Sequence, residues 1–420
     1  MPDRRLPVRP DLQQLKHQAK DLLRAVRRGD PPAIAHVERH HPEKVDPNDV
    51  TLADAQLVLA RSYRAPSWAR LVQACELVDA IWRDDVEAVR RLVRQNPRLL
   101  HEETLIRKDS SWGPPMTYAA NLGRDRIIDA LLELGATDLG TAVGRAALQG
   151  QIGTARGLHE RMGAPRPSAD ALAGPAYTLS ATGTALMLEL GAPVRDAGGN
   201  RLARVDVVLE TDSRTPSAKH EILEMYVRHG LALPDTPPMA VHRGRLDLLE
   251  KHLARDSGLL RRTFTYEEIY PPELGCHGEA THGTPLAGAT LLHMAIDYDE
   301  MEVARWLLER GMDVDAKAGV DGDGFGGHTA LFATVVSQPS FWMNHHGGPQ
   351  AAPFAQLLLD HGADPNARAS LRKQLHPGYG EDTMHEYRDV TPLSWGERFH
   401  DQRFVSRPAM RLIAARGGHR

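Results

Sequence analysis

Four segments in the C-terminal half of the sequence are rich in Pro and Gly and hold many of its histidine and tyrosine side chains. They run from Arg261 to Gly288, Ala318 to His328, Ser337 to Pro353 and Ala369 to Asp389. The candidate binding residues are Tyr266, Tyr270, His277, His282, Trp342, His345, His346, Tyr379, His385 and Tyr387, with Trp112 in an earlier loop. Imidazole groups ligate zinc, iron or manganese, and rigid aromatic rings are favoured at protein interfaces.

No characteristic spacing of metal ligands in the sequence supports a metal site. His385-Glu386 has no second His four residues after the first, so the H-E-x-x-H pattern is absent. Asp321-Gly322-Asp323-Gly324 is similar to part of a calcium loop but lacks the bidentate Glu at the twelfth position, which favours a plain hairpin loop. We therefore assign no catalytic residue, no metal ligand and no cofactor, and keep a pocket enzyme built from these loops as the alternative.

The aromatic side chains allow two interpretations. Because they stand in loops and not on helical stripes, Tyr266 and Tyr387 belong to a set that either contacts a partner or packs the loops against one another. Trp306 and Trp395 differ, since they fall inside helical patterns and are expected in the core. The sequence has no G-x-S-x-G element and its two cysteines, Cys75 and Cys276, form no C-x-x-C pair, so neither a serine nucleophile nor a disulfide framework is expected.

A recurring helix pair must carry these loops. Its clearest early copy runs from Pro114 to Ala136, with Ala119 and Ala120 in a first helix and Gly123 at that helix's end. A Leu- and Ile-rich second helix then ends at Gly135, and Gly163 and Gly191 repeat this ending at intervals of 28 residues. Such units cannot bury their apolar faces alone, so they are expected to stack.

These units resemble the ankyrin repeat. The strongest matches are Thr290-Leu291-Leu292-His293-Met294-Ala295 and the segment from Gln356 to Asn366, and a last copy opens at Thr391-Pro392-Leu393. The resemblance covers roughly residues 72 to 418 and implies an all-α solenoid that binds proteins. It also implies that His293 makes a structural hydrogen bond that steadies its turn. The four loops are insertions into this pattern, and insertions of repeat proteins tend to project on one face, so we expect them to converge.

The residues before Val72 do not fit the repeat. Leu12, Leu15 and Ala19 begin one helical apolar pattern, a second covers Leu52 to Ala60, and Ser67 is placed to cap a following helix. The chain is thus similar to bacterial-type ankyrin-repeat proteins with a helical N-terminal extension, which would cap the first repeat.

Composition narrows the class of partner. The net charge is −4, which is not the basic excess typical of nucleic-acid-binding domains. The sequence has no run of about 18 apolar residues and no signal-peptide pattern, so neither a membrane partner nor secretion is expected, and the cytoplasm is the expected compartment.

The sequence predicts an all-α ankyrin-repeat solenoid of eight to nine units with a helical N-terminal cap and long C-terminal insertions. We expect a capping module at 1–71, degenerate repeats at 72–260 and repeats with insertions at 261–420. The predicted function is a scaffold that presents its concave and loop surface to a protein partner. A small molecule bound in the C-terminal loops is the alternative.

Overall fold

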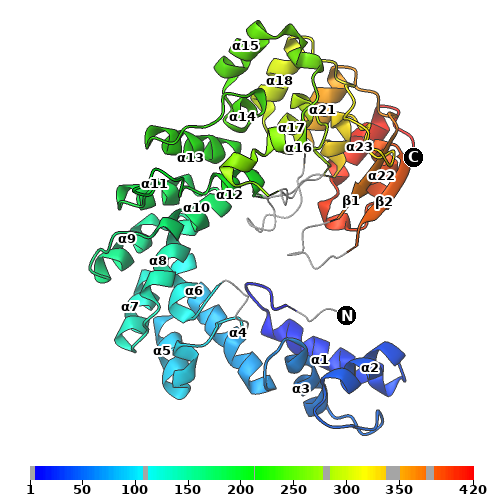
Figure 1. Ribbon diagram of the computed structural model, residues 1–420. Helices are drawn as coiled ribbons and strands as arrows, with labels where there is room; N and C mark the ends of the chain where they lie inside the picture. The colour runs from blue at the N-terminus through cyan, green and yellow to red at the C-terminus, as the bar shows by residue number, and fades with distance from the viewer. Residues whose placement is uncertain (1–4, 107–111, 212, 278–283, 337–350, 375–382) are drawn as a thin grey trace. The chain divides into compact units, whose positions relative to one another are not determined.

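The structure, a computed structural model, describes residues 5–106, 112–211, 213–277, 284–336, 351–374 and 383–420 (Figure 1). Contacts divide the chain into two compact units, Met1–Arg166 and Pro167–Arg420. Each unit is built from its own helices and is described by itself. The domain boundaries expected after residues 71 and 260 stay predictions.

Three helices open the N-terminal unit, namely α1 (Leu12–Arg27), α2 (Pro31–His40) and α3 (Leu52–Ser62). Their apolar faces form two small cores, one around Leu15 and Leu59 and the other around Val26 and Val58. Polar residues begin each helix: Asp11, Asp30 and Thr51 accept backbone N–H groups of the first turns of α1, α2 and α3, respectively. The predicted helices before residue 72 are confirmed.

Three helix pairs follow in the same unit. They are α4 (Trp68–Trp82) with α5 (Val86–Gln95), α6 (Pro115–Asn121) with α7 (Asp125–Glu133), and α8 (Leu139–Leu148) with α9 (Ile152–Arg161); a 3-10 turn, η1 (Pro97–Leu100), follows α5. First helices contact first helices, as α6 does α8, and second helices contact second helices, as α5 does α7. This is the packing expected of stacked repeats.

Six more pairs make up the C-terminal unit in its described residues. They are α10 (Ala173–Tyr177) with α11 (Ala181–Glu189), α12 (Val205–Glu210) with α13 (Pro216–Arg228), α14 (Pro237–His242) with α15 (Leu246–Arg255), α17 (Leu291–Asp297) with α18 (Met301–Glu309), α19 (Ala330–Val335) with α21 (Pro353–Asp360), and α22 (Pro392–Arg398) with α23 (Arg407–Ala415). Short elements η3 (Ala169–Leu172), η4 (Ser257–Arg261), α16 (Tyr266–Ile269), η5 (Pro272–Leu274) and η7 (Gln402–Phe404) lie between them. The helices α14, α17, α19 and α22 pack in sequence, one against the next.

Small residues and one glycine conformation explain the tight pairing. Ala119 and Ala120 on α6 are fully buried, which lets α7 and α8 approach closely. Gly123 follows α6 with φ +64°, a left-handed conformation that ends the first helix and turns the chain toward α7. Trp306 and Trp395 are buried, as expected, and the cysteines Cys75 and Cys276 are free and buried.

The all-α expectation needs one correction. Strands β1 (Ala369–Lys373) and β2 (His385–Val390) form an antiparallel hairpin in the fourth insertion. Alternate residues of β1 are buried, Ala369, Leu371 and Lys373, so the segment has a strand's period of two where a loop was expected. The fold is otherwise helical in the residues described.

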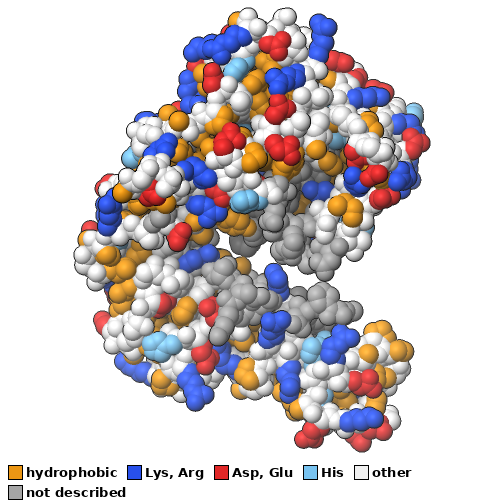
Figure 2. Space-filling view, viewed as in Figure 1, with side chains coloured by type: hydrophobic (Ala, Val, Ile, Leu, Met, Phe, Trp, Pro, Cys, Tyr) orange, Lys and Arg blue, Asp and Glu red, His pale blue; other side chains and the backbone are white. Residues whose placement is uncertain are grey.

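Charges are mixed over the surface. Figure 2 shows Lys and Arg side chains interspersed with Asp and Glu over the visible face. Across the described part of the chain, no helix has the length and apolar character that crossing a membrane requires.

Candidate functional site

Six of the candidate binding residues lie in the described part of the chain. Trp112 belongs to the N-terminal unit, and Tyr266, Tyr270, His277, His385 and Tyr387 belong to the C-terminal unit. The other five, His282, Trp342, His345, His346 and Tyr379, lie outside the described residues.

Two of the tyrosines are buried, so they do not offer a binding surface. The Tyr270 hydroxyl bonds to that of Tyr298, which donates to the carbonyl of Leu209 at 3.1 Å. The Tyr387 hydroxyl lies 2.6 Å from Nδ1 of His400. For Tyr270 and Tyr387 the candidate role as partner contacts is corrected: these rings pack the loops onto the helices, because their burial leaves nothing for a partner to touch.

The remaining four are partly or fully exposed. The ring of Tyr266 lies against Tyr270, with centroids 4.6 Å apart. His385 stacks on His400 at 3.9 Å, and the guanidinium of Arg145 lies 5.8 Å from the Trp112 ring centroid. These contacts hold the rings in place and leave part of each one accessible.

Three of the four insertions join in the C-terminal unit. The Gly319 N–H donates to the Gly288 carbonyl at 2.8 Å, which links the first insertion to the second. The Gly326 N–H donates to the Ser370 carbonyl at 2.6 Å, which links the second to the fourth. The convergence expected of all four insertions is therefore found for these three in their described residues, and residues 337–350 of the remaining insertion lie outside the described residues. We call the second and fourth insertions, in their described residues 318–328, 369–374 and 383–389, the joined loops.

A salt bridge stiffens the joined loops. The Arg372 guanidinium reaches Asp321 at 2.7 Å and Asp323 at 3.0 Å. Asp321 also accepts the backbone N–H groups of Asp323 and Phe325, each at 2.9 Å, and the bond from Phe325 does most to lower the Asp321 pKa. The hairpin interpretation of this segment is confirmed, since Val320 pairs with Gly326 across the turn.

The joined loops expose apolar side chains. Val320 is 63% exposed and Met384 is 51% exposed, more than any other large hydrophobic side chain among the described residues. In the same loops, the guanidinium groups of Arg372 and Arg388 lie over the Phe325 ring, 5.1 and 4.3 Å from its centroid. Exposed apolar groups together with charged ones are typical of protein interfaces.

Replacing Gly326 with alanine should separate these loops. Gly326 has φ +122°, and a Cβ there would overlap the Gly319 carbonyl oxygen. We expect a loss of about 1–3 kcal/mol in unfolding free energy and faster amide exchange in residues 318–328 and 369–373. Gly322→Ala is the matched control, because a Cβ at Gly322 meets nothing within 4 Å. Equal exchange in the two variants would show that the Gly326 contact does not hold the loops.

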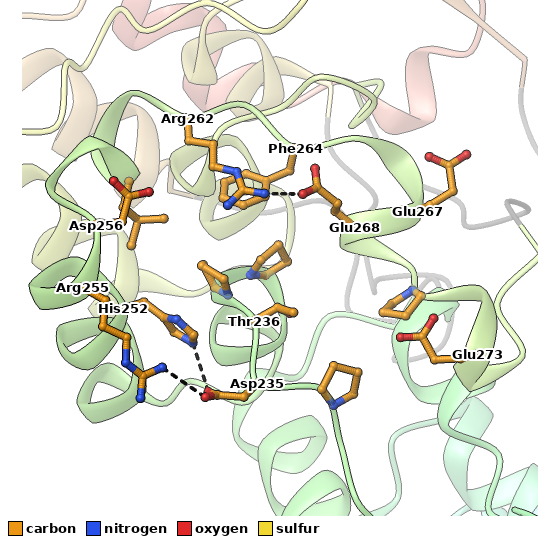
Figure 3. Close-up of a pocket in the computed structure, with 15 residues that line it drawn as sticks. Asp235, Thr236, His252, Arg255, Asp256, Arg262, Phe264, Glu267, Glu268 and Glu273 are labelled. Atoms are coloured by element: carbon orange, nitrogen blue, oxygen red, sulfur yellow. Dashed lines mark hydrogen bonds and ion pairs between the residues drawn. The ribbon is translucent and has the colours of Figure 1, made fainter.

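A pocket of about 490 Å³ lies elsewhere in the C-terminal unit (Figure 3). Its walls come from the loop before α14, the end of α15, and the first insertion with α16 and η5. The lining residues are Pro234, Asp235, Thr236, Pro237, Pro238, His252, Arg255, Asp256, Leu259, Arg262, Phe264, Glu267, Glu268, Pro271 and Glu273. Five of them carry carboxylates and two carry guanidinium groups, so the lining is acidic.

Some of the pocket's charges are already paired. Asp235 lies 3.3 Å from Arg255 and 3.1 Å from His252, and the hydrogen bond from Arg255 is the main cause of a lowered Asp235 pKa (Figure 3). Arg262 pairs with Glu268 and lies 4.8 Å from the Phe264 ring centroid. These contacts leave Glu267 and Glu273 on the rim, and neither has an ion-pair partner among the described residues.

A buried group of charges joins helix pairs of the same unit. The Arg214 Nε donates to the Asp297 carbonyl at 2.7 Å, and a terminal nitrogen of Arg214 lies 3.0 Å from the Asp297 carboxylate. Lys219 on α13 is buried, with Nζ 4.0 Å from the Glu300 carboxylate and 3.8 Å from the Tyr298 ring centroid. Burial is the largest cause of the lowered Lys219 pKa of about 8. Sequence reasoning missed this group, because paired members such as Arg214 and Asp297 are 83 residues apart.

His293 has the structural role that the resemblance implied. It is fully buried, its Nδ1 lies 2.8 Å from the Thr290 hydroxyl, and its Nε2 lies 2.9 Å from the His328 carbonyl. Burial lowers the pKa of His293 to about 4. The hydrogen bonds therefore tie the start of α17 to the loop before α19.

Histidine and carboxylate side chains do not assemble into a metal centre where they are described. Across those residues, no group of three or more His, Cys, Asp and Glu side chains is placed to hold a metal ion.

Comparison with known proteins identifies one repeat directly. The family described as Ankyrin repeat matches residues 287–316, which hold α17 and α18. The crystal structure of the human ASB11 ankyrin repeat domain is 14% identical, with a TM-score of 0.25, covering 73% of this chain and 99% of that one. The ankyrin repeat domain of Bcl-3, a member of the IkappaB protein family, is 14% identical with a TM-score of 0.21, covering 81% and 97%. No curated protein sequence matches significantly.

The matched repeat has the same helix arrangement as the helix pairs stacked beside it. The segment opens with Thr290 and His293 and has the same first-helix and second-helix arrangement as its neighbours. In the described residues, the fold is therefore a mostly helical ankyrin-repeat fold that includes a small two-stranded sheet.

Proposed function

We propose that this chain is a binding scaffold whose C-terminal unit presents the joined loops to a protein partner. The observation that carries the proposal is the exposure of Val320 and Met384 on loops that several contacts hold together. Ankyrin repeat domains generally bind proteins, and the helices before residue 72 would serve as the cap of the repeat array. The partner expected here has an apolar patch with charged groups around it.

The way the loops are held supports binding with little rearrangement. Loops that are mobile before contact lose conformational entropy on binding, which lowers affinity. Here the backbone bonds at Gly319 and Gly326 and the Arg372 salt bridge fix the loops in advance. Most of the interaction free energy of Val320 and Met384 would then appear as affinity.

The test is capture of partners from cells that express the chain naturally, read by quantitative mass spectrometry. The double variant Val320→Asp/Met384→Asp should capture at least about tenfold less partner than the wild-type chain. Each change removes apolar contact and adds a desolvation cost. Met162→Asp is the control, since Met162 is a 38% exposed methionine in the N-terminal unit.

Equal capture by the double variant and the wild-type chain would contradict the proposal. The same loss with Met162→Asp would contradict it too, because it would place the binding outside the joined loops. Circular dichroism of each variant checks that the fold is retained.

A further inference from the structure

We propose that the acidic pocket lined by residues 234–273 accepts an arginine or lysine side chain from a protein segment. This inference rests on the proposed function in one respect, namely that the ligand is a protein. The pocket is separate from the joined loops: its lining includes none of their residues. It is therefore a second contact point on the C-terminal unit.

The free charges of the pocket point to a cation. Glu267 and Glu273 lie on the rim, are exposed, and have no ion-pair partner in the part of the chain that the structure describes. Figure 3 shows Glu273 on the side of the pocket across from His252 and Arg255, and Glu267 at the outer edge. The two guanidinium groups of the lining, in contrast, are already held by Asp235 and Glu268. An incoming cation thus finds unpaired carboxylates, and an incoming anion finds no unpaired guanidinium.

Several wall positions supply no backbone hydrogen-bond donor. Pro234, Pro237, Pro238 and Pro271 have no N–H group. The guanidinium of arginine and the ammonium of lysine are rich in donors and have no acceptor. A phosphate or carboxylate ligand would need donors that these wall positions cannot supply.

The apolar part of the lining suits the stem of such a side chain. Pro234 and Pro237, which are partly exposed, can contact its aliphatic carbons while the charged end reaches the rim. The chain itself shows this mode of contact: Arg262 lies over the Phe264 ring and pairs with Glu268. A partner's arginine would use the same combination of an apolar surface and a carboxylate. A pocket of about 490 Å³ also has room for a side chain with part of its backbone.

The probe is a fluorescein-labelled peptide, Gly-Pro-Arg-Val-Arg-Gly amide, titrated against the full chain by fluorescence polarisation. The comparison peptide carries citrulline in place of each arginine, which keeps the shape and removes the charge. We expect the arginine peptide to bind, and the citrulline peptide to bind about tenfold or more weakly. Absence of binding by the arginine peptide, or equal binding by the citrulline peptide, would overturn the proposal.

Matched variants assign the binding to this pocket. Glu267→Gln/Glu273→Gln should weaken the arginine peptide about five- to tenfold. Glu302→Gln/Glu309→Gln removes two exposed carboxylates from α18 in the same unit and should leave binding unchanged. If both double variants weaken binding equally, the attraction comes from overall charge and the pocket assignment is wrong. Equally tight displacement by spermine would show that the site takes a free polyamine, which would also overturn the choice of a protein segment.

The two proposals fail separately. Val320→Asp/Met384→Asp should bind the arginine peptide as the wild-type chain does, because neither residue lines the pocket. If the peptide does not bind while partner capture still depends on Val320 and Met384, only the pocket assignment is contradicted. If the peptide binds and the double variant captures as much partner as the wild-type chain, only the proposed function is contradicted.

Discussion

Replacing Arg214 with methionine should lower the unfolding free energy of the C-terminal unit by about 3–5 kcal/mol. The Arg214 side chain is 2% exposed and the Asp297 side chain is fully buried. Methionine keeps much of the arginine's volume but removes the cation that lies 3.0 Å from the Asp297 carboxylate. Removing one partner of a buried ion pair is costly because the other charge then stays desolvated and unpaired.

The position of Arg214 spreads this effect over several helix pairs. Arg214 also donates to the Thr211 carbonyl at 2.9 Å, so it fixes the turn between α12 and α13 as well as the end of α17. Urea unfolding followed by circular dichroism measures the loss. The control is Arg310→Met, which removes an exposed ion pair with Glu250 and should cost less than about 1 kcal/mol. An equal loss of unfolding free energy in the two variants would show that the buried ion pair contributes no more to stability than the exposed one.

Acidification from pH 7 to pH 5 should destabilise the C-terminal unit through its buried histidines. Burial lowers the pKa of His293 to about 4 and that of His328 to about 3, from an ordinary value near 6.5. Both are neutral in the folded chain at pH 5, whereas the unfolded chain binds the protons. Their contribution is therefore complete above about pH 6.5 and is lost as the pH falls, by about 2 kcal/mol for each histidine at pH 5.

Neighbouring groups modify this trend in a defined way. His242 is also buried, with a pKa lowered mainly by burial, and it adds to the loss. Asp299 acts in the opposite direction, because its pKa is raised to about 6, and its contribution is small because the residue is exposed.

Unfolding curves at pH 7, 6 and 5 test the prediction. In His328→Asn an amide replaces the ring that bonds to the Pro285 carbonyl, and the loss between pH 7 and pH 5 should shrink by about 2 kcal/mol. His419→Gln removes an exposed histidine of the same unit and should leave the pH dependence as it is. The same pH dependence of stability in the wild-type chain and both variants would contradict the assignment to His328.

Local sequence patterns predicted the helices well because each carries its own signal. The 3.6-residue spacing in α1 and α3, the small residues of α6 and the glycines after the helices are visible without knowledge of distant contacts. The role of His293 was implied by the resemblance to the ankyrin repeat, and its hydrogen bond to Thr290 closes within one helical turn.

Contacts between distant residues could not be predicted in this way. Arg214 and Asp297 are 83 residues apart, and each looks like an ordinary surface charge in the sequence. The pocket joins residues from Pro234 to Glu273 that share no motif. Tyr270 and Tyr387 stand in Pro- and Gly-rich loops that suggested exposure, but those loops fold back onto the helices. The burial of a loop residue depends on packing that composition does not encode.

Hydrogen–deuterium exchange on the complex with the captured partner tests the central claim most directly. The proposal predicts that partner binding slows amide exchange in residues 318–328 and 383–389, where Val320 and Met384 stand, and leaves α1 to α3 unchanged. Unchanged exchange in both loop segments, with protection confined to other parts of the chain, would contradict it.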